Sequence, residues 1–150
     1  MRSFDHDFVE NILQRMSKIP ADAKPAWGKM TRDELIGHMT MVMRYTLGKG
    51  PEMPDKSTWV SRNIIRHLIL NGIVAIPQNV RLPKPKKPGE APPPTGDMET
   101  LHAVLEEYLS AAETGRLSPP PHFFFGDLGV DGWAKMHVLH FEHHLKQFGV

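Results

Sequence analysis

The chain has 150 residues, an apolar fraction of 40% and a charged fraction of 23%, so we predict one globular domain over residues 1–150. Its formal net charge of +1 argues against nucleic acid and against an anionic membrane as partners. The lack of cysteine excludes disulfides, thiolate metal ligands and a cysteine nucleophile, and favours a cytoplasmic location.

The first two predicted helices have clear start signals. The first runs from about Asp5 to Ser17, with Ser3 as its N-cap and apolar residues at helical spacing. The second begins at Thr31, which is three residues before Glu34 and predicts a capping box. It should continue to about Leu47, where two glycines follow and end the helix.

A third helix and a long loop follow. The helix should cover about 57–72, with an apolar stripe of Trp59, Ile64, Ile65, Leu68 and Ile69. The longest apolar stretch, 64–76, contains charged and polar residues and predicts no membrane span. From 73 to 96 the chain is rich in proline, which lacks a backbone donor, so we predict an extended crossover loop. Its basic segment RLPKPKKP has no interleaved aromatics, which favours a solvated linker over a phosphate-binding segment.

Two more helices complete the predicted fold. One should cover 97–114 and end at Gly115, and the last should begin at Asp131 and end before Gly149. No segment shows the alternation of a strand, and we find no internal repeat. Several amphipathic helices with one long crossover predict an all-α helical bundle.

Histidines occupy the apolar side of the last helix. On a helical wheel, His137, His140 and His144 lie within ~60° of one another in the middle of that side, and His143 lies toward its edge. A buried imidazole without a partner costs ~1–3 kcal/mol, so these side chains need partners. His140 and His144 are four residues apart, which lets their ring nitrogens converge on one transition metal ion. The alternative is that the three are packed histidines bonded to backbone or carboxylates.

A third ligand should come from another helix, because two ligands hold an ion weakly. His38 borders the apolar stripe of the second helix and follows Gly37, which leaves room beside it. His137 is a candidate fourth ligand or a partner of the ligands. Glu142 falls on the solvent side of the wheel, so the zincin motif, in which a glutamate directly follows the first histidine, is absent.

The loop before the last helix contains His122-Phe123-Phe124-Phe125-Gly126. Two interpretations stay open for it. His122 and Phe124 could belong to a mobile lid over the metal end of the bundle. Equally, the aromatic side chains could form a hydrophobic plug that caps the bundle.

Three segments resemble the DinB-like superfamily of metal-binding four-helix bundles: WGKMT, ELIGHMTMVMRYTLG and, after the proline-rich middle, FFFGDLGVDGWAKMHVLHFEHHLKQFGV. The chain is similar to an uncharacterised branch that ends in a His-x-x-His-His-Leu-x-Gln-Phe-Gly motif, here His140 to Gly149. The resemblance covers nearly the whole chain. It implies a four-helix bundle with a long second connection and a metal site of His38, His140 and His144.

The resemblance also implies chemistry, since characterised relatives include thiol-dependent transferases and isomerases. We therefore expect one divalent transition metal (Zn, Ni or Fe), with a small-molecule thiol as a candidate partner and a homodimer as a candidate assembly. We expect no nucleic-acid and no membrane partner. A metal-dependent transferase or hydrolase is the first functional hypothesis, and a non-catalytic, metal-braced binding module is the alternative. An open coordination position would favour catalysis, and a closed four-ligand site would favour bracing.

Overall fold

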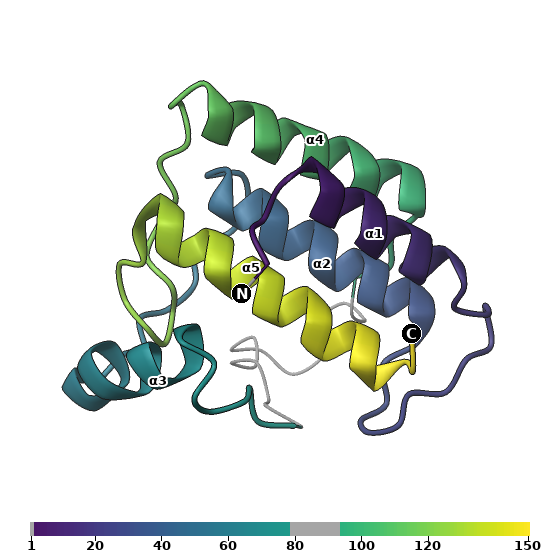
Figure 1. The fold of residues 1–150 in the computed structure, drawn as a ribbon, viewed down its shortest axis with the longest axis horizontal. Coiled ribbons are helices and arrows are strands. Elements are labelled where there is room, and N and C mark those ends of the chain that lie inside the picture. Colours follow the sequence, from purple (N-terminus) through teal and green to yellow (C-terminus); the bar gives the residue numbers. More distant parts are fainter. Residues whose placement is uncertain (1, 79–93) are drawn as a thin grey trace.

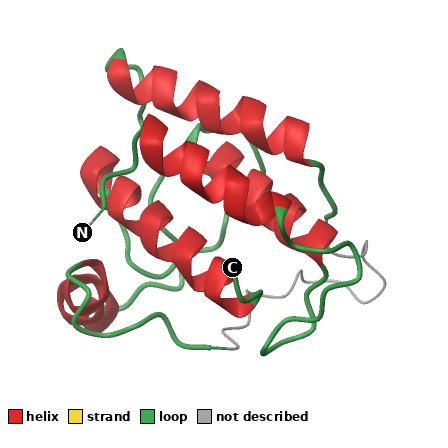
Figure 2. Cartoon of the chain, turned by 45° about the vertical axis from the view of Figure 1, so that its right-hand side comes forward, coloured by secondary structure: helices red, strands yellow, loops and turns green. Residues whose placement is uncertain are grey.

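The computed structural model of the chain describes residues 2–78 and 94–150. These residues contain helices and no strand (Figure 2), which confirms the predicted all-α fold. In chain order the helical elements are α1 (His6–Ser17), α2 (Arg32–Thr46), the π-helical segment η1 (Ser61–Ile65), α3 (Arg66–Leu70), α4 (Met98–Glu113) and α5 (Gly129–Gln147).

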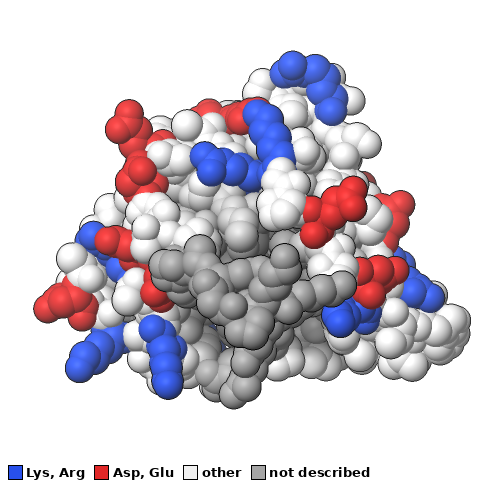
Figure 3. Space-filling model, turned by 180° about the vertical axis from the view of Figure 1, so that it is seen from behind, with Lys and Arg blue, Asp and Glu red and all other residues white. Residues whose placement is uncertain are grey.

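Four of the helices form the bundle, and η1 with α3 lies to one side of it (Figure 1). Helix α4 packs on α1 and α2, and α5 packs on the same two helices from the other side. The apolar stripe predicted for α4 is confirmed, because its members are all buried: Leu101, Val104, Leu105, Tyr108 and Leu109. On the face seen in Figure 3, acidic and basic side chains of the described residues are interspersed.

Local signals set the helix starts. Thr31 and Glu34 form the predicted capping box: the Thr31 hydroxyl accepts from the Glu34 N–H at 3.2 Å, and the Glu34 carboxylate accepts from the Thr31 N–H at 3.0 Å. The prediction of Ser3 as the first N-cap is wrong. Asp5 takes that place, because its carboxylate accepts from the Phe8 N–H at 2.9 Å. Helix α5 begins at Gly129, two residues before the predicted start.

The apolar stripe predicted for the third helix is right at Ile65 and Ile69 and wrong at its other end. Trp59 is 65% exposed and Ile64 is 45% exposed, whereas Ile69 and Leu70 face inward. The reason is η1, whose wider turn breaks the 3.6-residue period on which the predicted stripe depends. The inward residues belong to a second core cluster beside the start of α5: Tyr45, Ile69, Leu70, Phe125, Trp133 and Met136.

The central part of the predicted crossover, 79–93, lies outside the described residues and includes RLPKPKKP. The chain returns against α2, where the Gly96 N–H donates to the Asp33 carbonyl at 3.0 Å. A side chain at Gly37 would overlap the backbone carbonyl of Pro94, so the glycine makes room for the returning chain. This contact lies one residue before His38. Among the described residues, no helix is long and apolar enough to cross a membrane.

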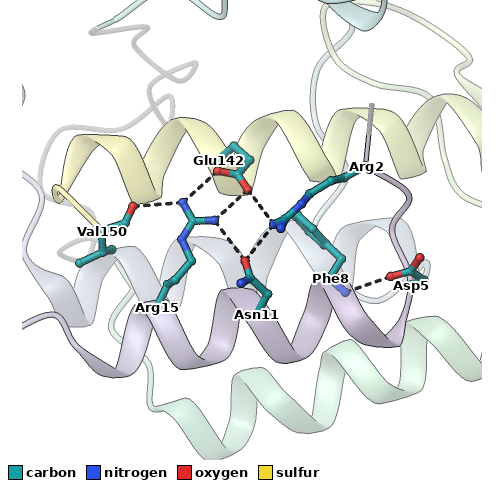
Figure 4. Close-up of polar contacts among 7 residues, drawn as sticks. All are labelled: Arg2, Asp5, Phe8, Asn11, Arg15, Glu142 and Val150. Atoms are coloured by element: carbon teal, nitrogen blue, oxygen red, sulfur yellow. Dashed lines mark hydrogen bonds and ion pairs between the residues drawn. The ribbon is translucent and has the colours of Figure 1, made fainter.

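The helical wheel predicted that Glu142 points to solvent. Its side chain is 37% exposed, but it also has a partner on another helix. Its carboxylate accepts two bonds from the Arg15 guanidinium, at 2.8 and 2.9 Å (Figure 4). Arg15 also donates to the Val150 carbonyl at 3.1 Å, and Asn11 accepts from both Arg15 and Arg2. The contact joins α1 to α5 and fixes how α5 is rotated about its axis, so that its histidines face α2.

We expect Arg15→Met to lower the free energy of unfolding by ~1–2 kcal/mol, because a two-point charged contact is lost and the Glu142 carboxylate is left without its main partner. Urea denaturation measures the change. Arg44→Met, on the exposed side of α2, is the control and should shift stability by less than ~0.5 kcal/mol. Equal effects of the two substitutions would contradict the role given to Arg15.

Candidate metal centre

Three histidines from two helices meet inside the bundle. His38 projects from α2, and His140 and His144 project from successive turns of α5. The Nε2 atom of His140 is 3.0 Å from that of His38 and 3.0 Å from that of His144. His38 and His144 are each 8% exposed. The structure therefore brings together the three residues that the sequence predicts as ligands.

The proton on His144 can be placed from its hydrogen bonds. The Gln147 side-chain amide donates from Nε2 to the Trp27 carbonyl at 2.8 Å, so its Oε1 must be the atom that faces His144 Nδ1 at 2.7 Å. An amide oxygen only accepts, and His144 Nδ1 therefore carries the proton. In the neutral ring, Nε2 then presents a bare lone pair to the cluster.

Hydrogen bonds alone cannot satisfy this cluster. If His140 Nε2 carries a proton, it donates to His144 and has no lone pair for His38. If His140 Nε2 carries none, it accepts from His38, and two lone pairs then face each other at His144. In both cases one of the two 3.0 Å contacts lacks a well-aligned hydrogen bond. A cation among the three nitrogens would remove this conflict.

A protonated histidine is not that cation at neutral pH, because the pKa values of all three rings are lowered. Burial, reinforced by the neighbouring His144, lowers the pKa of His38 to about 3. Burial also lowers the pKa of His144 to about 4. The pKa of His140 falls well below its ordinary value, first through burial and then through the charges of the surrounding histidines. All three rings are therefore neutral near pH 7, which is the form that binds metal.

The spacing and chemistry of the three nitrogens fit one transition ion. Two nitrogens bound to one ion at ~2.0–2.1 Å lie ~2.9–3.4 Å apart in tetrahedral or octahedral geometry. His140 Nε2 is 3.0 Å from each of the other two, and all three lie within 4.8 Å of one another. Neutral imidazoles suit zinc, nickel and iron. Within residues 2–78 and 94–150, no fourth histidine, aspartate or glutamate joins the group. A three-ligand set of this kind leaves coordination positions for non-protein ligands.

His137 lies apart from the cluster. It is fully buried, and its Nε2 lies 3.3 Å from the Thr46 hydroxyl oxygen, which itself donates to the Met43 carbonyl. His137 therefore donates from Nε2, and because burial lowers its pKa to about 3, the ring is neutral near pH 7. Its ring stacks on Trp133 at 5.4 Å and meets the edge of Tyr108 at 5.1 Å between centroids. Within the described residues, its Nδ1 has no hydrogen-bond partner.

The HFFFG loop packs at the start of α5. His122 Nδ1 accepts from the backbone N–H groups of Phe124 and Phe125, each at 3.1 Å, so this ring stabilises its own turn. Phe125 is buried in the second core cluster, and Phe124 packs against that cluster. The role of His122 and Phe124 in a lid stays a prediction. His143 is half-buried and meets Trp27 edge-on, with 5.5 Å between ring centroids.

Gln147 is the residue of this centre that sequence reasoning missed. It stands three residues after His144 in the terminal motif, and it is 5% exposed. The signal available in the sequence was a glutamine one helical turn after a candidate ligand. Its partner, the Trp27 carbonyl, could not be found from the spacing of residues.

Comparison with known proteins gives a family and no activity. The family model described as "Protein of unknown function (DUF1569)" matches residues 12–149. The matched range contains His38, His140 and His144. None of the curated proteins and none of the solved structures matches the chain.

We expect the metal-free protein to lose stability as the pH falls below 6.5. An unfolded histidine takes up a proton near pH 6.5, whereas burial, followed by the nearby His122, lowers the pKa of His137 to about 3 in the folded chain. Between pH 6.5 and pH 3 the folded state binds fewer protons than the unfolded state does. The contribution of His137 to the free energy of unfolding is therefore greatest above pH 6.5 and decreases toward pH 3. For His137 alone the loss by pH 5 is about 2 kcal/mol.

Urea denaturation with a chelator, at pH 7, 6 and 5, measures this loss. Carboxylates titrate mostly below the window and contribute little to the slope. In His137→Leu the slope of the unfolding free energy against pH should decrease, because one buried neutral histidine has been removed. An unchanged slope would show that His137 is protonated in the folded protein.

Proposed function

The chain belongs to the DUF1569 family, and we propose that it binds one divalent transition metal ion through His38, His140 and His144. The observation that carries the proposal is the convergence of three neutral Nε2 atoms that protons cannot satisfy together. Zinc, nickel and iron are the candidate ions. We also propose that the family is related to the DinB-like superfamily, whose ligand pattern these positions match.

We further propose that the centre serves a metal-dependent transferase that uses a small thiol. A bound ion would supply Lewis acidity, which favours the thiolate form of a thiol ligand. The chain has no cysteine, so a sulfur nucleophile must come from a cosubstrate. Glu142, the carboxylate nearest to the histidines along α5, is held by Arg15 on another side of the helix and is not available as a general base.

The alternative function is a metal-braced bundle that acts as a binding module. It is favoured by the way the three ligands join two helices, α2 and α5, that otherwise make few contacts with each other. An ion there would tie the helices together. The two functions differ in whether the ion accepts an exchangeable non-protein ligand.

Purified protein should hold about one transition ion per chain, as measured by elemental analysis, because one cluster offers one site. His38→Ala, His140→Ala and His144→Ala should each abolish binding, since two histidines hold an ion weakly. His143→Ala is the matched control, because this neighbour of His144 packs on Trp27 instead of joining the cluster. If His143→Ala and His144→Ala lose the ion equally, the proposed ligand set is wrong.

The thiol proposal can be tested with cobalt-loaded protein, whose visible spectrum reports the ligands of the ion. Adding a small thiol such as glutathione should produce a sulfur-to-metal charge-transfer band in the wild type. The band should be absent in His144→Ala, which lacks a ligand, and present in His143→Ala. A spectrum that does not respond to small thiols would favour the metal-braced bundle.

A further inference from the structure

We propose that Gln147 is a positioning residue of the metal centre. It holds His144 in the tautomer with the proton on Nδ1, so that Nε2 is always free to bind the ion. This inference rests on the proposed metal site and adds a residue that determines how well the site binds.

Gln147 is itself held firmly. Its side chain is buried, and it makes two hydrogen bonds, from Nε2 to the Trp27 carbonyl at 2.8 Å and from His144 Nδ1 to Oε1 at 2.7 Å. Its backbone carbonyl accepts from the Ala26 N–H at 2.8 Å. Residues 26 and 27 therefore hold the main chain and the side chain of Gln147 through one hydrogen bond each. Because the Trp27 carbonyl can only accept, the amide cannot turn over and offer its N–H groups to His144.

Two histidines outside the cluster, His137 and His122, have the opposite tautomer. His137 donates from Nε2 to Thr46, and His122 accepts at Nδ1 from two backbone N–H groups, so both carry their proton on Nε2. In each case the hydrogen-bond partner decides the tautomer. A proton on Nε2 would prevent His144 from binding the ion, and Gln147 supplies the acceptor that keeps it on Nδ1.

A glutamine suits this position better than a carboxylate does. The amide gives His144 an acceptor without adding a negative charge beside the ion, and its other end donates to the Trp27 carbonyl. A glutamate would keep the acceptor but would place a second oxygen against that carbonyl. Partners of this kind typically change metal affinity 10–100-fold.

Nitrogen-15 NMR of the histidine side chains in metal-free protein tests the tautomer directly. We expect the proton on Nδ1 in wild-type His144 and on Nε2 in His137, which is the internal control. Gln147→Leu should abolish the preference at His144 and leave His137 unchanged. Gln147→Glu retains an acceptor and should retain the proton on Nδ1.

Zinc affinity, measured by competition with a chromophoric chelator, gives the second readout. Gln147→Leu should bind zinc ~10–100-fold more weakly than the wild type. A wild-type His144 protonated on Nε2 would overturn the inference even if Gln147→Leu did not fold. Unchanged affinity in a folded Gln147→Leu would also overturn it. Failure of the wild type to bind any transition ion would instead contradict the proposed function and leave the tautomer result intact.

Discussion

The central constraint in this protein is that three imidazole nitrogens lie together in a space where protons cannot satisfy them. His144 presents a lone pair because Gln147 occupies its other nitrogen, and His140 has at most one proton for two neighbours at 3.0 Å. Burial keeps the rings neutral. In water such nitrogens would simply bind solvent, whereas between α2 and α5 a single cation could satisfy all three. The packing around them serves to maintain that arrangement.

Two other histidines, His137 and His122, have hydrogen-bond partners outside the cluster. His137 donates to Thr46 and is stacked among aromatic rings, and His122 accepts two backbone N–H bonds within its own turn. Both have a structural role that their neighbours explain. The three clustered rings instead point at one another. Each ring outside the cluster therefore bonds to a group that is not a histidine, whereas the clustered Nε2 atoms face only one another. The helical wheel alone could not make this distinction between His137 and His140.

The sequence predicted what depends on local spacing. The capping box of α2 and the pairing of His140 with His144 involve residues three or four apart, so helical geometry alone defines them. The partner of Glu142 was missed because a wheel gives a direction and not the neighbour found there, which is Arg15 of α1. The stripe of the third helix failed at Trp59 and Ile64 because η1 departs from the regular helical period. Gln147 was missed because its partner is a backbone carbonyl in a distant loop.

The three clustered histidines lower the stability of the fold, which suggests that they are kept for function. At its buried positions leucine would pack without polar atoms, whereas unsatisfied nitrogens destabilise a fold by ~1–3 kcal/mol each. The bundle can tolerate this because two apolar clusters and the Arg15–Glu142 contact hold the helices independently of the histidines. Proteins break the rules of core packing mostly at functional sites. The three clustered histidines are therefore better explained by what they bind than by what they add to the packing.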